Sequence, residues 1–148
     1  MTSELPAIGA KAPDFSATTN DGSPVSLREL LASGAVVLFF YPGDDTPGCN
    51  KQLCAVRDDR AEFEAANVQP FGVNPAGIAS HAKYVAKFGF NFPLLVDEDS
   101  AIAAAYGAVK DDGKKIQRTV IGIGRDGTIR FAARGAPPPR EVIAALEE

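Results

Sequence analysis

The two cysteines, Cys49 and Cys54, are the side chains best suited to do chemistry, and they stand five positions apart. Two cysteines are too few for a disulfide scaffold, and a chain of 148 residues does not need one to fold. The single histidine, His81, is distant in sequence and has no further soft ligands nearby, so a structural zinc site is poorly supplied. A redox role for the thiols is the better interpretation.

The sequence around Cys49 predicts a nucleophile at the tip of a helix. Residues 35–41, AVVLFFY, are an apolar run typical of a strand buried on both faces, and the loop PGDDTPG and a helix over residues 49–66 follow. This order puts the loop at the carboxyl end of the strand, the usual ligand crevice of an open α/β sheet. The first helical turn offers unpaired N–H groups and the positive end of the dipole, which both favour thiolate over thiol.

A sulfenic acid formed on Cys49 would condense readily with a second thiol, and Cys54 is a candidate. Five residues of an ideal helix correspond to about 500° of rotation and a rise of about 7.5 Å, which leaves the two Cα atoms about 8–9 Å apart. A disulfide requires Cα atoms closer than about 7 Å. An intact helix cannot hold this bond, so we predict that oxidation is coupled to unwinding around residues 46–58.

Pro42, Thr46 and Cys49 form the pattern P-x-x-x-T-x-x-C, which suggests a pocket for a peroxide. The Thr46 hydroxyl can face this pocket together with the backbone N–H groups of Gly48 and Cys49. Such groups can hold the peroxide oxygens in line with the sulfur and stabilise charge on the leaving oxygen. Arg118, at the start of a predicted strand over residues 119–123, is the candidate for a cation that favours the thiolate and orients the peroxide.

Each of these residues also has a plainer interpretation. Cys49 is an inert buried thiol in the alternative, although the flanking Gly and Pro residues favour an exposed loop. Cys54 can belong to an apolar stripe near Leu53, with resolution by the thiol of another molecule. Thr46 can cap the helix and Pro42 can end the strand, roles that are compatible with the functional ones.

The charged residues near the motif are open to the same question. Arg118 can be an ordinary exposed arginine, with Arg57 or Arg60 as substitutes on the helix itself. His81 is interpreted as a surface residue of a helix and is left out of the site. The acidic pair at positions 44 and 45 is interpreted as a solvated turn, because adjacent carboxylates diverge and lack further ligands.

The rest of the chain alternates short strands and helices. Near its start, strands at residues 15–18 and 24–27 flank an Asp-Gly pair, which is a hairpin signal. Further strands are predicted at residues 69–74, 94–96, 119–123 and 128–133, and further helices at residues 79–88, 100–106, with Ser100 as N-cap, and 140–146. The pattern predicts an α/β fold, one domain over residues 1–148, with a mixed central sheet covered by helices on both faces.

Composition excludes several classes of partner. The 15 basic and 19 acidic residues give a net charge of −4 and are interspersed, so no nucleic acid partner is indicated. No apolar run approaches the roughly 18 residues of a membrane helix, and the start lacks the features of a secretory leader. We therefore expect a cytoplasmic protein with no membrane partner.

These residues resemble those of the peroxiredoxins, and FYPGDDTPGCNKQLCAVRD is similar to the bacterioferritin comigratory protein or peroxiredoxin Q group. The similarity extends over GAKAPDFSATTNDGSPVSL, FGVNPAGIASHAKYVAKFGFNFPLLVDED, AYG and RTVIGIGRDGTI. It implies a thioredoxin-like fold with an N-terminal β-hairpin extension, and reduction of hydrogen peroxide and organic hydroperoxides. Cys49 would be the peroxidatic and Cys54 the resolving cysteine, with Pro42, Thr46 and Arg118 around the pocket.

The resemblance also implies regeneration by thioredoxin or a similar dithiol protein and no metal, haem or flavin cofactor. Resolution within one chain removes the need for a dimer, so a monomer is expected, with a weak homodimer as the alternative. This chain departs from the group at Gln52, where the pattern has Glu, and at Ala76, Gly77 and Val96, where more polar residues are expected.

Two other functions stay open from the sequence. A thioredoxin-type disulfide oxidoreductase relies on C-x-x-C, whereas this chain has C-x-x-x-x-C, and the spacing argues against that class. The other is a redox-sensing or holdase binding protein whose oxidised form exposes apolar surface.

Overall fold

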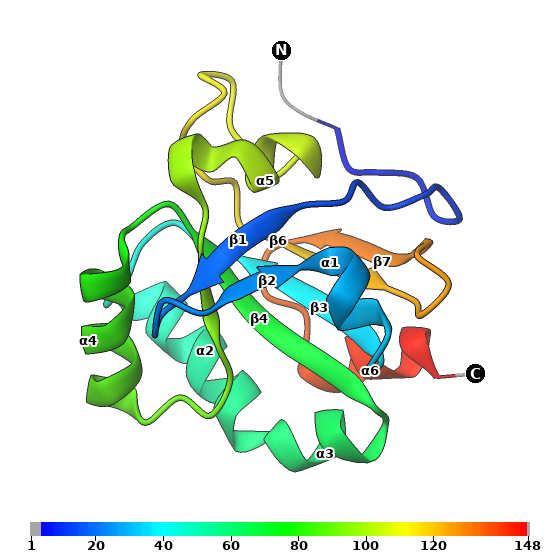
Figure 1. The fold of residues 1–148 in the computed structure, drawn as a ribbon, viewed down its shortest axis with the longest axis horizontal. Helices are drawn as coiled ribbons and strands as arrows, with labels where there is room; N and C mark the ends of the chain where they lie inside the picture. Colours follow the sequence, from blue (N-terminus) through cyan, green and yellow to red (C-terminus); the bar gives the residue numbers. More distant parts are fainter. Residues whose placement is uncertain (1–3, 148) are drawn as a thin grey trace.

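A computed structural model describes residues 4–147, which form one seven-stranded mixed sheet in the order β2-β1-β5-β4-β3-β6-β7 (Figure 1). The central strands β3, β4 and β5 run parallel, and β6 and β7 extend the sheet antiparallel on one side. The hairpin of β1 and β2 extends it on the other side, through antiparallel pairing of β1 with β5. The strands are β1 Ser16–Thr19, β2 Pro24–Ser26, β3 Ala35–Phe40, β4 Val68–Asn74, β5 Leu94–Val96, β6 Thr119–Ile123 and β7 Ile129–Arg134.

Helices cover both faces of the sheet, as the sequence predicted (Figure 1). One face packs against α1 and α5, and the other against α2, α3, α4 and α6. The helices are α1 Leu27–Leu31, α2 Pro47–Asp58, α3 Arg60–Ala65, α4 Ile78–Phe88, α5 Ala101–Ala105 and α6 Pro139–Leu146, with a 3₁₀ turn at Glu98–Ser100.

Strand β3 supplies both cores, which explains its unbroken apolar sequence. All six of its residues are buried, and alternate side chains enter opposite layers because successive side chains of a strand point to opposite faces. Val36, Leu38 and Phe40 pack under α1 and α5, while Val37 and Phe39 pack under α2 and α6. The strand therefore holds the loop that follows it in a fixed position between the two layers.

Two predicted helix boundaries were wrong. The predicted helix over residues 49–66 is two helices, α2 and α3, separated at Asp59, whose backbone leaves the helical region. Helix α2 begins two residues earlier than predicted, at Pro47, because proline suits the first helical position. As a result Cys49 lies at the third residue of the helix, still within its first turn.

The Ser100 side chain does not cap α5, contrary to the prediction. Its hydroxyl donates to the Lys114 carbonyl at 2.8 Å, and the Asp97 carboxylate instead accepts from the backbone N–H groups of Ile102 and Ala103 at 2.7 and 2.9 Å. Burial raises the pKa of Asp97 despite these two bonds. The cap is therefore supplied from three residues upstream of the predicted position.

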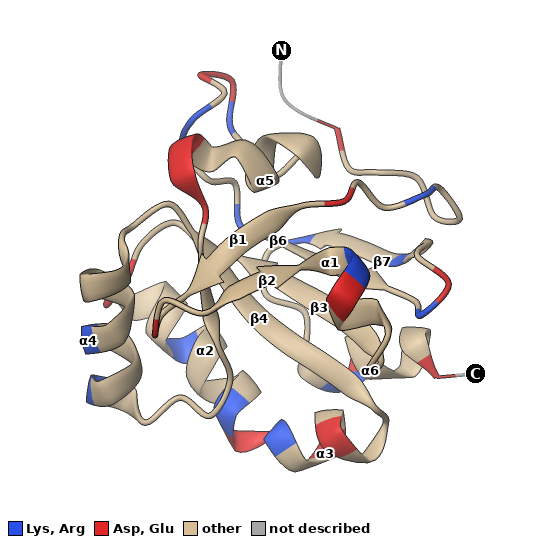
Figure 2. Cartoon of the chain, viewed as in Figure 1, with Lys and Arg blue, Asp and Glu red and all other residues tan. Residues whose placement is uncertain are grey.

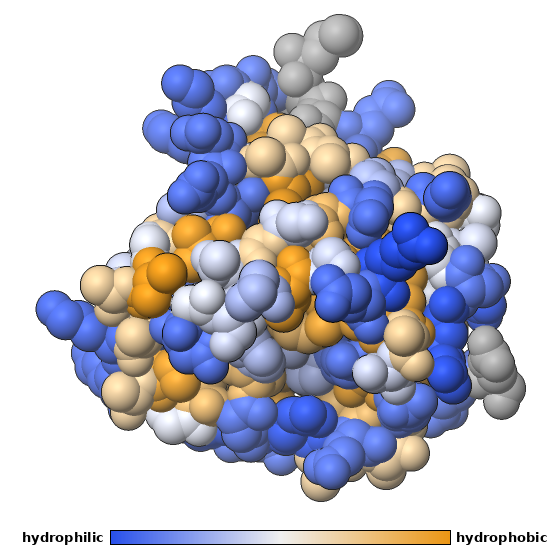
Figure 3. Space-filling model, viewed as in Figure 1, coloured by the Kyte–Doolittle hydropathy of each residue, from blue (hydrophilic) through white to orange (hydrophobic). Residues whose placement is uncertain are grey.

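Charged residues are distributed over helices and loops rather than gathered in one run (Figure 2). The face drawn in Figure 3 mixes hydrophilic and hydrophobic side chains. Among residues 4–147, the large hydrophobic side chains that are exposed are Ile8 and Ile78. None of the helices over these residues has the length and apolar character needed to cross a bilayer.

Candidate functional site

The Cys49 sulfur lies just beneath the tip of α2. Thr46, Pro47 and Gly48 are exposed, whereas Cys49 has 0 % exposure and packs with Tyr41 and Leu53 in the core between α2 and the sheet. The expectation of an exposed loop therefore holds for the residues before Cys49 and is wrong for Cys49 itself. The reason is the helix geometry, which turns the third residue toward the sheet while the first two face solvent.

Arg118 lies directly beside this sulfur. Its Nη2 donates to Cys49 Sγ at 3.2 Å. The contact arises because β6 pairs antiparallel with β3, with Thr119 opposite Phe40, so the residue before β6 reaches the start of the loop that follows β3. The sequence suggested this neighbouring strand, and the structure brings the guanidinium to the thiol.

The two alternative cations are engaged elsewhere. Arg57 Nη1 donates to the Phe88 carbonyl at 2.6 Å, and Arg60 Nε donates to the Asn91 carbonyl at 3.3 Å. Asp58, which accepts from Arg57 Nε at 3.0 Å, raises the pKa of Arg57. Both arginines therefore hold the end of α2 and the start of α3 against the end of α4 and the segment after it, and Arg118 is the cation at Cys49.

Gly48 leaves room for the guanidinium. A Cβ atom added to Gly48 would lie 3.2 Å from Arg118 Nη2 and 3.9 Å from Cζ, and the first of these distances is tighter than a normal van der Waals contact. The missing side chain thus permits Arg118 to approach the helix tip. The backbone N–H groups of Gly48 and Cys49, in the first turn, have no acceptor within the helix.

Gln52 is a site residue that the sequence interpretation noted only as a departure from a family pattern. It stands one helical turn after Cys49, and its Oε1 accepts a hydrogen bond from Arg118 Nη1 at 2.7 Å. The residue is only 6 % exposed, and its Nε2 is buried without a hydrogen-bond partner among the described residues. The spacing of three from Cys49, which puts both side chains on one helix face, was the signal that could have identified it.

Thr46 and Pro42, which the sequence places around the pocket, are both exposed. Thr46 occupies the N-cap position of α2, but its hydroxyl donates to the Gly43 carbonyl at 3.1 Å instead of accepting from the helix. The plain capping role is therefore not realised by the side chain. Because its proton is used in this bond, the Thr46 oxygen keeps a free lone pair with which it can accept.

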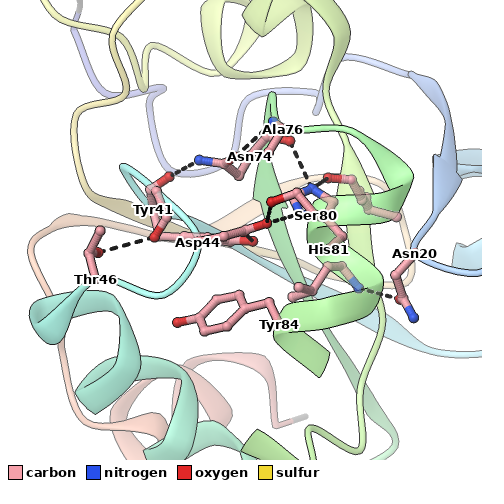
Figure 4. Close-up of polar contacts among 12 residues, drawn as sticks. Asn20, Tyr41, Asp44, Thr46, Asn74, Ala76, Ser80, His81 and Tyr84 are labelled. Atoms are coloured by element: carbon pink, nitrogen blue, oxygen red, sulfur yellow. Dashed lines mark hydrogen bonds and ion pairs between the residues drawn. The ribbon is translucent and has the colours of Figure 1, made fainter. Parts of the chain in front are cut away.

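A partly buried polar network fixes the loop between β3 and α2, and it centres on Asp44 (Figure 4). One carboxylate oxygen accepts from the Tyr41 hydroxyl at 2.7 Å, and the other accepts from the Ser80 hydroxyl and faces His81 Nδ1, each at 2.7 Å. Burial opposes ionisation, but the hydrogen bonds from His81, Ser80 and Tyr41 outweigh it and lower the pKa of Asp44. Burial and the Asp44 charge in turn raise the pKa of Tyr41.

His81 is fully buried, so its interpretation as a surface residue was wrong, and so was the solvated turn at Asp44. Its Nε2 lies 3.1 Å from the Asn74 carbonyl and 3.0 Å from the Leu95 carbonyl. Nδ1 faces the Asp44 carboxylate, so both ring nitrogens lie against oxygen atoms that can accept a hydrogen bond. The network therefore ties the loop before α2 to α4 and to the ends of β4 and β5.

The first turn of α2 is also tied to α4. The Tyr84 hydroxyl donates to Asn50 Oδ1 at 2.7 Å, and Asn50 Nδ2 donates to Asp45 at 3.2 Å. Lys87 pairs with the same Asp45 carboxylate at 2.6 Å and holds its pKa below the usual range. Burial raises the pKa of Tyr84, so this hydroxyl stays a donor at neutral pH.

Cys54 is half-buried on the same helix and packs against the core that contains Cys49. Both thiols are free, and the helix between them is continuous. The Arg57 carbonyl accepts from Asn91 Nδ2 at 3.2 Å, so the end of α2 is held through both the carbonyl and the side chain of Arg57. The predicted unwinding on oxidation therefore has to involve the first turns and remains a prediction.

Comparisons with known proteins agree on one family. Residues 8–132 match the model of the AhpC/TSA family. The chain is 37% identical over 128 residues to the putative peroxiredoxin bcp of Coxiella burnetii, which covers 82% of this chain and 84% of that protein. It is 39% identical over 103 residues to the chloroplastic peroxiredoxin Q of Arabidopsis thaliana, covering 70% of this chain and 47% of that protein. The chain thus spans about half the length of this plant relative.

Solved structures give the same result. Peroxidoxin BcpB from Mycobacterium tuberculosis superimposes with a TM-score of 0.89 at 30% sequence identity, over 97% of each chain. The bacterioferritin comigratory protein of Xanthomonas campestris, studied for its alkyl peroxide reduction activity, superimposes with a TM-score of 0.79 at 30% identity, over 97% of this chain and 93% of that one. These neighbours confirm the thioredoxin-like fold.

The relatives support a thiol-based peroxidase activity and a peroxide substrate. A cysteine at a helix tip with an arginine at 3.2 Å is the arrangement that such chemistry needs. By its sequence and its fold, this chain belongs to the AhpC/TSA family of peroxiredoxins, in the group of the bacterioferritin comigratory proteins and peroxiredoxin Q.

Proposed function

We propose that this chain is a thiol-dependent peroxidase for hydrogen peroxide and organic hydroperoxides in which Cys49 is the attacking residue. The observation that carries the proposal is the 3.2 Å contact between Arg118 Nη2 and Cys49 Sγ in the first turn of α2. The guanidinium charge and the helix dipole both stabilise a thiolate there, and the thiolate is the nucleophilic form of cysteine.

In the first step the Cys49 thiolate attacks the terminal oxygen of the peroxide. A sulfur–oxygen bond forms, the oxygen–oxygen bond breaks, and the leaving alkoxide or hydroxide takes up a proton from solvent. Cys49 becomes a sulfenic acid, and the peroxide is reduced to an alcohol or to water. Arg118 would stabilise the charge that builds on the leaving oxygen, because a fixed cation there needs no reorganisation during the reaction.

Residues around the tip of α2 would orient the peroxide. The Thr46 oxygen can accept the O–H proton of the substrate, since its own proton is bound to the Gly43 carbonyl. The backbone N–H groups of Gly48 and Cys49 can donate to the peroxide oxygens, and Pro42 would shield the entrance. Because Cys49 has 0 % exposure, the tip of α2 has to move slightly before a substrate reaches the sulfur.

Resolution would come from Cys54 of the same chain. The Cys54 thiolate attacks the Cys49 sulfenic sulfur, a disulfide forms, and hydroxide leaves and is protonated to water. This step needs the first turns of α2 to unwind, which breaks the contacts of Arg118 with Cys49 and Gln52 and that of Tyr84 with Asn50. Thioredoxin or a similar dithiol would then reduce the disulfide, and a monomer suffices for the cycle.

Peroxide consumption coupled to a thioredoxin system tests the proposal. Cys49→Ser should abolish it, because serine is not ionised at neutral pH, and a variant as active as the parent would remove the peroxidase function. Cys54→Ser should retain one oxidation per chain but lose most of the coupled turnover. Peptide mapping after one equivalent of peroxide should find a Cys49–Cys54 link in the parent. An unchanged turnover of Cys54→Ser would instead indicate resolution by another molecule.

A further inference from the structure

Arg118 bridges two residues of one helix face, and each terminal nitrogen of its guanidinium has its own partner. Nη2 contacts Cys49 Sγ at 3.2 Å, and Nη1 donates to Gln52 Oε1 at 2.7 Å. Cys49 and Gln52 are three positions apart, which puts their side chains side by side on α2. The shorter contact, to Gln52, fixes the plane of the guanidinium and so determines which nitrogen faces the sulfur.

Gln52 is held in this orientation against its own hydrogen-bonding needs. Only Oε1 can face Arg118, because the reversed amide would put two donors against each other. The opposite end of the amide, Nε2, is then buried without a partner among residues 4–147, which carries a desolvation penalty. An apolar residue of the same size would avoid that penalty, so stability alone does not account for a glutamine here.

The charge balance of the site gives the reason for an amide. Among the described residues, no carboxylate forms an ion pair with Arg118. The amide oxygen accepts a hydrogen bond without cancelling the guanidinium charge, whereas a carboxylate would do both. A carboxylate at this position would also add a negative charge close to the thiolate, which disfavours ionisation of the thiol.

We propose that Gln52 is a positioning residue that aims Arg118 at Cys49 while leaving the guanidinium charge uncompensated, so that this charge acts on the thiolate. The inference rests on the proposed function, since it names the residue that sets the reactivity of the same sulfur. Gln52 would have two effects: it orients the Arg118 guanidinium, and it leaves the guanidinium charge uncompensated. A different substitution of Gln52 tests each effect.

Gln52→Glu tests the charge, because it keeps the shape and the acceptor oxygen. The rate of Cys49 alkylation by iodoacetamide is measured against pH in a Cys54→Ser background, so that one thiol reacts. The pH midpoint of this rate should rise by about one unit in Gln52→Glu, and the rate well below the midpoint should fall about tenfold. Lys51→Gln is the control: it changes the net charge equally, from an exposed position on the same helix, and should shift the midpoint far less.

Gln52→Met tests the orientation, because it keeps the volume and removes the acceptor. In a single turnover with hydrogen peroxide above the alkylation midpoint, the rate of Gln52→Met should fall by about tenfold, the effect of losing one oriented group. Gln52→Glu should stay within about threefold of the parent under the same condition, because its Arg118 is still held. Circular dichroism and melting curves confirm that each variant is folded.

An unchanged alkylation midpoint in Gln52→Glu would overturn the proposal, whatever its peroxide rate. An unchanged single-turnover rate in Gln52→Met would also overturn it, since Arg118 would then need no anchor. Alkylation does not involve peroxide, so the first result stands apart from the peroxidase assay. If Cys49→Ser remained an active peroxidase, the proposed function would fail while the alkylation profile would still report on Gln52.

Discussion

Two polar clusters, one around Asp44 in the loop between β3 and α2 and one around Cys49 in the first turn of α2, differ in how fully their polar atoms are satisfied. In the first, the Asp44 carboxylate accepts from Tyr41 and Ser80 and faces His81, and both ring nitrogens of His81 face acceptors. In the second, around Cys49, the amide nitrogen of Gln52 has no partner among residues 4–147. Fully bonded buried networks make a structure rigid and specific.

This difference indicates that the two clusters have different roles: the Asp44 network anchors the loop, and the Cys49 cluster sets the reactivity of the thiol. The Asp44 network holds the start of the loop to β4, β5 and α4, so the loop keeps its position when the helix tip moves. In the Cys49 cluster, the Arg118 guanidinium points at the Cys49 sulfur, and Gln52 Nε2 makes no hydrogen bond among residues 4–147. Local rules of polar satisfaction are often broken at functional sites and compensated elsewhere. Substitutions in the first cluster should therefore change stability, and substitutions in the second should change rate.

The largest expected effect is on stability, in His81→Ala. Removing the imidazole leaves the Asp44 carboxylate and two carbonyl oxygens without this donor in a buried site. A buried polar group that loses its hydrogen-bond partner costs about 1–3 kcal/mol of unfolding free energy, and several groups lose this partner here. Urea unfolding at pH 7 measures the loss. As a control, Lys87→Ala removes an exposed ion pair with Asp45 and should leave the urea midpoint nearly unchanged.

The dependence of the unfolding free energy on pH, below about pH 4, gives a second test of the Asp44 network. The pKa of Asp44 is lower in the folded chain than its ordinary value, so its contribution is fully present above about pH 4 and is lost as pH falls through the folded value. The parent should therefore lose stability steeply on acidification below pH 4 or so. In His81→Ala the shift shrinks and this part of the curve should flatten. An acid slope equal to that of the parent would show that the network does not stabilise the Asp44 carboxylate.

The next effect is on rate, in Arg118→Met. Removal of a preorganised cation from the reacting atoms costs about 10²–10³ in rate, or about 2.7–4 kcal/mol of transition-state stabilisation. Peroxide consumption and Cys49 alkylation should both fall, while the melting temperature should change by only a few degrees. Arg118→Lys should recover little, because an ammonium on a flexible chain does not reproduce the planar fork that contacts both Cys49 and Gln52. A melting temperature that collapsed with the rate would remove the contrast between the two clusters.

The sequence predicts the features that depend on local patterns, and it does not predict those that depend on contacts between distant positions. The apolar run of β3 and the spacing to Cys49 are local patterns, and they predicted the strand, the loop and a first helical turn at Cys49, although the helix begins two residues earlier. Arg118 could be proposed as the cation at Cys49 because the strand that follows it was expected to lie beside β3, as it does. His81 and Asp44 are 37 positions apart, and neither carries a periodic signal, so their pairing could not be predicted. Burial of a lone histidine becomes visible only after α4 packs on the ends of β4 and β5.

The smallest expected effect, and the most selective, is on Gly48→Ala. Its backbone is not in the left-handed region, so alanine is accommodated by the helix and should stabilise α2 by up to about 1 kcal/mol. The added methyl carbon, however, would lie 3.2 Å from Arg118 Nη2 and displace the guanidinium by a few tenths of an ångström. We expect about a tenfold loss of Cys49 reactivity, since small misplacements of a preorganised group are costly.

This single substitution distinguishes an effect on stability from an effect on rate, because the melting temperature should rise while the rate of Cys49 alkylation falls. Melting curves and Cys49 alkylation on the same preparation measure both. Gly77→Ala is the matched control: Gly77 precedes α4, and a Cβ there would meet nothing within 4 Å, so Cys49 reactivity should stay that of the parent. If Gly48→Ala reacted as fast as the parent, the room that Gly48 leaves for the Arg118 guanidinium would not limit the reaction.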